Sequence, residues 1–170
     1  MSAAATAPTQ KRDLDMAQAG VTTSDVEIII TVEPQLAAVV RKRVPFARIP
    51  ETQRQARATL STAFESADVQ PVGPWLTVWR TPQDGLIDYA PGVFVPEGTR
   101  EMDGIELFAL PQGRAAHLRL HGPYEGLPDA WGRLFAGCNG HRLAGLNWEI
   151  YSVPNGGQEN IQTDLYAFLA

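Results

Sequence analysis

Short segments in the first half of the chain recur in the second half, in the same order. Each segment of the second copy lies between 72 and 78 residues after its counterpart. This repeat constrains the fold most, because each half should form the same group of helices and strands. Two such halves usually pack about a pseudo-twofold axis, with a groove between them. The matched segments are Pro34-Gln35 and Pro111-Gln112, Pro45-Phe46 and Pro123-Tyr124, residues 73–79 and 145–151, and residues 93–95 and 167–169.

The hydrophobic pattern predicts the same order of elements, β-β-α-β-β, in each half. Runs of apolar and β-branched residues bounded by Pro, Gly and Asn indicate strands, and apolar residues at helical spacing indicate one helix per half. Consecutive strands are expected to pair as hairpins. The predicted strands cover residues 26–32, 36–44, 75–81, 86–95, 105–110, 114–121, 146–153 and 161–169, and the predicted helices begin at Pro50 and Leu127.

The expected fold class is therefore α+β, with duplicated β-β-α-β-β halves, antiparallel sheets, two main helices and a central cleft. One half alone would leave a large apolar sheet face open, so the halves should merge into one domain over residues 26–170. The halves span about residues 26–96 and 104–170. Residues 1–25 are expected to form a poorly ordered N-terminal tail, because their start is rich in Ala, Thr and Gln and is followed by charged residues.

Composition excludes several classes of protein. The net charge of −5 and the absence of a basic run interleaved with aromatics argue against direct nucleic acid binding. A single cysteine, Cys138, rules out an internal disulfide and a cysteine-based zinc site. The three histidines lack metal-ligand spacing, and no phosphate-binding or dinucleotide motif is present, so neither a metal nor a cofactor is expected. No apolar run could span a membrane or act as a signal peptide, so we expect a cytoplasmic protein.

The strand predicted over residues 146–153 carries an acidic residue in an apolar setting. Because side chains alternate between the two faces of a strand, Glu149 should share a face with Asn147 and Tyr151. An ionised carboxylate in this position is costly unless something pairs with it. In the repeat, the equivalent positions of the first half are Trp75, Thr77 and Trp79.

If the two equivalent strands approach each other across the pseudo-twofold axis, one surface carries Glu149, Tyr151, Trp75 and Trp79. A carboxylate beside several aromatic rings is chemically suited to a flat or cationic organic ligand. Each contact between a cation and an aromatic ring contributes roughly 0.5–2 kcal/mol. The sequence therefore predicts a ligand site on this surface.

Plainer interpretations remain open at this stage. Glu149 could pair with an arginine such as Arg80, Arg114 or Arg119, or lie on a solvated sheet face. Each tryptophan could serve only in core packing. The aromatic residue that follows a proline at the start of each helix, Phe46 or Tyr124, could anchor the helix to the sheet or line the groove.

The order of these features resembles a known family. Gly122-Pro123-Tyr124 is followed by an amphipathic helix with Trp131, then by the strand over residues 148–151, then by a final strand from Thr163. This order is similar to that of the GyrI-like (gyrase-inhibitor-like) effector-binding domains, which also occur attached to AraC-type and MerR-type regulators. The resemblance covers about residues 26–170.

The resemblance implies a duplicated domain with a central cleft that binds hydrophobic, often cationic, compounds against a strand glutamate, which corresponds to Glu149. The favoured function is a stand-alone binding protein for such a molecule. An alternative is a hydrolase of electrophilic, cyclopropane-type natural products, with Glu149 and Tyr151 as catalytic residues. A further alternative is a protein partner role, with gyrase or a regulator. The expected ligand-binding residues are Glu149, Tyr151, Trp75, Trp79, Asn147, Tyr124, Phe46 and Trp131.

Overall fold

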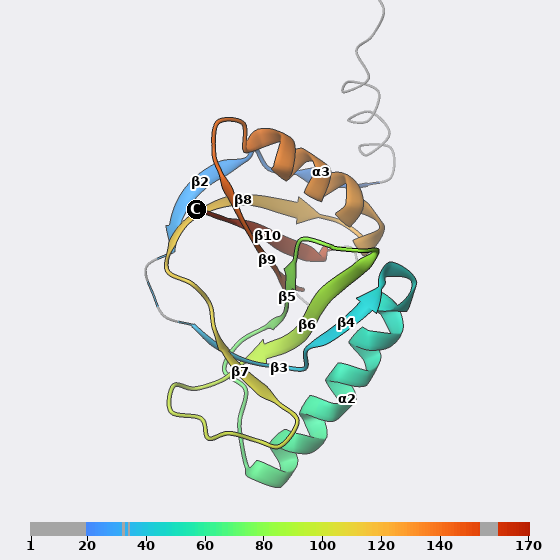
Figure 1. Cartoon of the computed structure of the whole chain (residues 1–170), viewed down its shortest axis with the longest axis vertical. Coiled ribbons are helices and arrows are strands. Elements are labelled where there is room, and N and C mark those ends of the chain that lie inside the picture. The colour runs from blue at the N-terminus through green and yellow to red at the C-terminus, as the bar shows by residue number, and fades with distance from the viewer. Residues whose placement is uncertain (1–19, 32, 34, 154–159) are drawn as a thin grey trace, which may run out of the picture.

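The described strands form one sheet, and two α-helices pack against it (Figure 1). The computed structural model describes residues 20–31, 33, 35–153 and 160–170, so the predicted tail over residues 1–25 lies mostly outside the described residues. The elements are β1 (Thr22–Thr23), β2 (Glu27–Thr31), β3 (Leu36–Val39), β4 (Lys42–Pro45), the 3-10 helix η1 (Phe46–Arg48), α2 (Ile49–Ala67), β5 (Trp75–Arg80), β6 (Leu86–Phe94), β7 (Glu106–Ala109), β8 (Gly113–His121), the 3-10 helix η2 (Tyr124–Gly126), α3 (Leu127–Gly137), β9 (Leu143–Ser152) and β10 (Gln162–Leu169).

The strands β5 and β9 lie in the middle of the sheet and pair antiparallel, with Thr77 opposite Glu149. The sheet continues from β5 to β6 and β3, and from β9 to β10 and β8. Outward from the β5–β9 pair, the strands of each half therefore follow in the same order, since β6 and β3 are the counterparts of β10 and β8 in the repeat. This arrangement confirms the predicted α+β class and is consistent with two related halves. The two equivalent strands are neighbours in this pairing, which meets the condition on which the predicted ligand surface depends.

Two of the predicted hairpins are wrong, because β2 and β7 each pair with a strand of the other half. Ile29 of β2 lies opposite Ala115 of β8, and Phe108 of β7 lies opposite Ala37 of β3. The strand β3 has β6 on one edge and β7 on the other, so neither edge is left for β2. This exchange of strands joins the halves by backbone hydrogen bonds on both sides of the molecule.

The strand predicted over residues 36–44 is interrupted between β3 and β4. Arg41 lies in this interruption, and its guanidinium forms salt bridges with Asp88 at 2.6 Å and Glu106 at 2.8 Å. Both β3 and β4 pair with β6, so the interruption leaves the position of the chain along β6 unchanged. The other two predicted hairpins, β5–β6 and β9–β10, are confirmed.

The helix α3 covers the face of the sheet that bears Glu149. Ala130 and Leu134 of α3 form one core cluster with Leu118 and Leu165 of the sheet. Leu165 lies directly opposite Glu149 in the pairing of β10 with β9, and residues opposite each other in an antiparallel pair point to the same face.

The helix α2 covers the same face on the other side of the β5–β9 pair. Leu60 and Phe64 cluster with Val93, which lies opposite Trp75 and therefore on the face of Thr77. Figure 1 shows α3 across the strands β8 and β10 and α2 beside β4 and β6, with β5 and β9 between them. The two helices thus flank the central strands that carry Thr77 and Glu149.

Both helices start from the same local sequence, a proline followed by an aromatic residue. Pro45-Phe46 and Pro123-Tyr124 each lead into a 3-10 turn that continues directly as the α-helix. A second proline stands in the first turn of each helix, where its missing N–H costs no hydrogen bond. The two aromatic rings are therefore held at the same end of their helices. Neither helix is long and apolar enough to cross a membrane.

Candidate functional site

The carboxylate of Glu149 is buried at the centre of the sheet and is held by two neutral donors. Nε1 of Trp131, on α3, donates to Oε1 of Glu149 at 2.6 Å, and the hydroxyl of Tyr151 donates to Oε2 at 2.5 Å. Only 8% of the surface of Glu149 is exposed. Its position confirms the predicted alternation, since Trp148 points to the opposite face and packs in the core there. A buried carboxylate is thus placed between the two helices with no cation among these partners.

A second set of polar side chains connects this carboxylate to α2. The hydroxyl of Tyr151 lies 2.7 Å from Oγ1 of Thr77, and Nε2 of Gln53 donates to the same oxygen at 2.7 Å. Nε2 of Gln53 also donates to the hydroxyl of Tyr89, on β6, at 2.7 Å. The site is therefore one continuous hydrogen-bond network that reaches from α2 to α3 across the central strands.

Burial controls the ionisation of this network. It raises the pKa of Glu149 above its ordinary value, and the hydrogen bonds from Tyr151 and Trp131 act in the opposite direction without cancelling it. Burial, followed by the nearby charge of Glu149, raises the pKa of Tyr151 well above its usual range. The same causes raise the pKa of Tyr89 to about 12. The phenols therefore stay protonated at neutral pH, and Glu149 is the group of this network whose charge changes most easily.

Aromatic rings surround the carboxylate on the side of α3. Trp79 contacts Trp131 edge to face, with ring centroids 4.7 Å apart, and Phe135 stacks on Trp131 at 5.4 Å. Tyr124, at the start of α3, contacts Tyr151 edge to face at 5.7 Å and is 44% exposed. Tyr124 thus connects the buried network to the surface, whereas Trp79 is part of the packing behind Trp131.

The structure brings together some of the predicted site residues and separates others. Glu149, Tyr151, Trp131 and Tyr124 are in direct contact through the interactions above. Trp75 instead packs beside α2, where the guanidinium of Arg57 lies 4.6 Å from its ring centroid. The predicted residues that none of these contacts joins to Glu149 are Trp75, Phe46, which is 56% exposed at the start of α2, and Asn147.

Asn147 is buried on the face of Glu149, two residues before it on β9. It is 3% exposed, and its Nδ2 is one of the two buried side-chain atoms of the described residues that have no hydrogen-bond partner. The other is Oγ1 of Thr163, which lies opposite Tyr151 in the pairing of β10 with β9. Two unpartnered polar atoms thus flank the carboxylate along the strands.

None of the three arginine pairs that the sequence left open for Glu149 forms, and Arg80 points to the opposite face of β5 from Thr77. Arg119 binds Asp164 through Nε at 2.8 Å, and Arg114 contacts Nδ1 of His141 at 3.0 Å. Asp164 also accepts from Nε2 of His117 at 2.7 Å. This ion-pair cluster lies on the opposite face of the sheet from Glu149, because Asp164 pairs with Ile150.

Sequence reasoning missed Gln53 and Tyr89, which complete the network. Tyr89 lies opposite Trp79 in the pairing of β6 with β5, and strand alternation could have placed it on this face. No local signal distinguishes Gln53 from the other polar residues of α2, because its role depends on which strand the helix crosses. Among the described residues, no group of three His, Cys, Asp or Glu side chains is placed to hold a metal ion.

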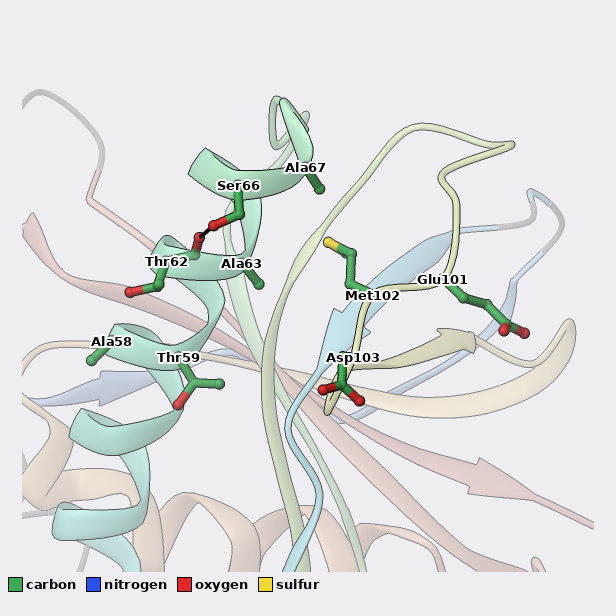
Figure 2. Close-up of a pocket in the computed structure, with 9 residues that line it drawn as sticks. All are labelled: Ala58, Thr59, Thr62, Ala63, Ser66, Ala67, Glu101, Met102 and Asp103. Atoms are coloured by element: carbon green, nitrogen blue, oxygen red, sulfur yellow. Dashed lines mark hydrogen bonds between the residues drawn. The ribbon is translucent and has the colours of Figure 1, made fainter.

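A groove with a volume of about 680 Å³ lies elsewhere, on the far part of α2. Figure 2 shows that it runs between α2 and the segment of residues 101–103, with Met102 and Asp103 facing the helix. Its walls consist mainly of short side chains such as Thr59 and Ala63. None of the predicted site residues lines it, and it offers no aromatic ring. The candidate site is therefore assigned to the Glu149 network rather than to this groove.

Comparison with known proteins identified one family and several related folds. The model of a family described as the GyrI-like small molecule binding domain matches residues 28–169. The comparison with curated proteins found no match.

Several solved structures have a similar fold. The EcmrR C-terminal domain is 15% identical, with a TM-score of 0.68, over 88% of this chain and 98% of that one. The chain covers 62% of the EcmrR chain solved in a complex with DNA. SAV2435, solved bound to tetraphenylphosphonium, is 9% identical over 86% of this chain and 94% of that one, with a TM-score of 0.62. A hydrolase from Listeria innocua is 14% identical over 86% of this chain and 92% of that one, with a TM-score of 0.56. At these identities the likeness shows the fold alone.

Proposed function

Because the chain belongs to the family of GyrI-like small molecule binding domains, we propose that it binds a hydrophobic organic cation against Glu149, between α2 and α3. The observation that carries this proposal is the carboxylate of Glu149, which is buried and hydrogen-bonded only by neutral donors. A ligand cation would supply the missing countercharge, and the removal of the pair from water would strengthen the attraction.

The aromatic side chains around Glu149 suit the hydrophobic part of such a ligand. Trp131 and Tyr151 touch the carboxylate, and the exposed ring of Tyr124 lies against Tyr151. A cation over an aromatic face gains about 0.5–2 kcal/mol, more when both are out of water. In this proposal the ligand displaces the ring of Tyr124 from Tyr151 to reach the carboxylate. The related fold of SAV2435, bound to the aromatic cation tetraphenylphosphonium, supports the choice of ligand class.

The test compares a cation with a neutral molecule of similar shape. Isothermal titration calorimetry with tetraphenylphosphonium and with triphenylphosphine oxide should show that Glu149→Gln weakens binding of the cation at least tenfold, about 1.4 kcal/mol. Binding of the neutral compound should change much less. An equal loss for both compounds would contradict the electrostatic part of the proposal. Absence of cation binding to the wild-type protein would contradict the proposal as a whole.

A hydrolase is the second candidate, and the short contact between Tyr151 and Glu149 favours it. A carboxylate with a raised pKa can accept a proton from water, and the water oxygen can then attack an electrophilic carbon, as in a strained cyclopropane. Tyr151 stays protonated and can donate to the oxygen of the ring-opened product. The ring C–C bond at the attacked carbon breaks, and its electron pair moves to a conjugated carbonyl oxygen, which takes the proton of Tyr151. Glu149 then returns the proton taken from water to Tyr151 through their contact, so no further reactant is needed. Turnover beyond one equivalent of protein, lost in Glu149→Gln, would establish this activity.

A further inference from the structure

Two hydroxyl groups stand between the amide of Gln53 and the carboxylate of Glu149. The successive distances are 2.7 Å from Gln53 to Thr77, 2.7 Å from Thr77 to Tyr151 and 2.5 Å from Tyr151 to Glu149. Thr77 is fully buried, so its hydroxyl proton needs an acceptor. The side-chain groups beside it are the amide of Gln53 and the hydroxyls of Tyr151 and Tyr89. The positions of the protons can therefore be deduced from the number that each group carries.

The observed contacts fit one direction of donation. The Nε2 atom of Gln53 has two protons and only donates, and it donates to the hydroxyls of Thr77 and Tyr89. Tyr151 has one proton for its two contacts, with Thr77 and with Glu149. If it donates to an ionised Glu149, the hydroxyl of Thr77 must donate to Tyr151. In this direction the protons that Gln53, Thr77 and Tyr151 donate each have an acceptor, and the last acceptor is an ionised carboxylate. This direction of donation therefore corresponds to a charged Glu149.

A turn of the Gln53 amide favours the opposite direction of donation. A protonated Glu149 would give its proton to Tyr151, which would donate to Thr77. The proton of Thr77 would then need another acceptor. It is either the hydroxyl of Tyr89 or, after the amide turns by half a rotation, the amide oxygen of Gln53. Gln53 is the group of this chain that has donors on one side and an acceptor on the other.

We propose that Gln53 is a positioning residue for the ligand site, whose amide orientation sets the direction of the hydroxyl chain and thereby holds Glu149 in its ionised form. The titratable groups that face Glu149 are the phenols of Tyr151 on β9 and Tyr89 on β6, and both keep their protons at neutral pH. On α3 and β5 the facing groups are Trp131 and Thr77, which do not titrate. The charge of Glu149 is thus governed by burial and by this network.

The test replaces Gln53 with a group that only accepts. An ionised carboxylate in Gln53→Glu forces Thr77 to donate toward α2, so the titration midpoint of Glu149 should rise by about one pH unit. The midpoint is followed by the ¹³C chemical shift of the side-chain carboxyl and is assigned with Glu149→Gln. A lysine side chain only donates hydrogen bonds, so Gln53→Lys should lower the titration midpoint of Glu149. Gln55→Glu, on the exposed side of the same helix, is the matched control and should leave it unchanged.

A second substitution separates the hydrogen-bond chain from the through-space effect of the new charge. Thr77→Val keeps the shape of the side chain and removes the hydroxyl that joins Gln53 to Tyr151. In the Thr77→Val background, the shift caused by Gln53→Glu should fall to less than half of its value in the wild-type background. Equal shifts in the two backgrounds, or no shift in either, would overturn the proposal. If Gln53→Glu does not fold, the shift caused by Gln53→Lys is compared in the same two backgrounds instead.

The consequence for ligand affinity depends on the proposed function, whereas the titration does not. At a pH between the titration midpoints of the two proteins, Gln53→Glu should weaken binding of tetraphenylphosphonium severalfold, and the loss should shrink at higher pH, where Glu149 is ionised in both. If the wild-type protein does not bind this cation, the proposed function fails, and the titration midpoints still decide the role of Gln53. If the cation binds and the titration midpoint of Glu149 is the same in the Gln53 variants as in the wild-type protein, the proposed role of Gln53 is wrong and the proposed function stands.

Discussion

The hydroxyl of Tyr151 lies 2.5 Å from the carboxylate of Glu149, two residues earlier on the same strand. The contact is possible because residues i and i+2 of a strand point to the same face, here the face between the two helices. The phenol is a neutral donor, so it supports the charge of the carboxylate without compensating it. Burial opposes that charge, and the stability of the protein should therefore depend on pH through Glu149.

We predict that Glu149→Gln changes the pH dependence of stability. The folded state raises the pKa of Glu149 above its ordinary value of 4.5, so ionisation of this group costs folding free energy as the pH rises from that value through the folded pKa. Glutamine does not ionise. In urea unfolding, the free energy of unfolding of the variant should rise relative to that of the wild-type protein as the pH increases across this window. The expected gain is about 1.4 kcal/mol for each unit by which folding raises the pKa of Glu149. Parallel stability profiles for the two proteins would contradict the prediction.

We predict that the indole N–H of Trp131 matters for Glu149 and that the neighbouring ring of Trp79 does not. Trp131→Phe removes the donor to Oε1 but keeps a ring against Phe135, so the titration midpoint of Glu149 should rise. Trp79→Phe alters the same aromatic cluster without removing a hydrogen bond to the carboxylate. It is the matched control and should leave the midpoint near its wild-type value. The ¹³C titration of the carboxyl measures both, and equal shifts would show that ring packing alone controls Glu149.

We predict that Asp164 stabilises the fold at neutral pH and not in acid. Burial opposes its ionisation, but hydrogen bonds from His117 and Arg119 outweigh burial and lower the pKa of Asp164 below its ordinary value. A carboxyl group with a lowered pKa contributes stability above its unfolded pKa, and that stability is lost as the pH falls through the folded pKa. Asp164→Asn should cost about 1–3 kcal/mol at pH 7, in urea unfolding, and much less in acid.

The control for this prediction is Asp84→Asn. The side chain of Asp84 is 93% exposed and lies 3.9 Å from Arg43, so little stability should depend on it. Its backbone has a φ of 53°, which asparagine also adopts readily. A loss at Asp84 as large as that at Asp164 would show that net charge, rather than the contacts with His117 and Arg119, explains the effect.

The faces of the central strands could be predicted from the sequence, because alternation is a local property of an extended chain. It placed Glu149 with Tyr151 and opposite to Trp148, and the structure agrees. The repeat also identified Thr77 as the counterpart of Glu149, and these two residues lie opposite each other in the β5–β9 pair. Each of these results follows from spacing along the chain and requires no knowledge of distant contacts.

Pairing between strands could not be predicted in the same way. The segments of β2 and β3 are adjacent in sequence and both apolar, which is typical of a hairpin, yet β2 pairs with β8 and β3 with β7. A strand with two free edges can satisfy its backbone with any suitable neighbour. Which neighbour it takes depends on the whole sheet, and the local pattern is the same for either choice.

The sequence by itself determined the α+β class, the positions of the two helices and the face of the strand that carries Glu149, since these depend on periodicity and on proline positions. Only the tertiary structure decided that β2 and β7 cross between the halves, that Trp75 packs away from the carboxylate beside Arg57, and that Gln53 reaches Thr77. Such contacts join residues far apart in the chain. They depend on how the helices cross the sheet, and no short-range pattern encodes that geometry.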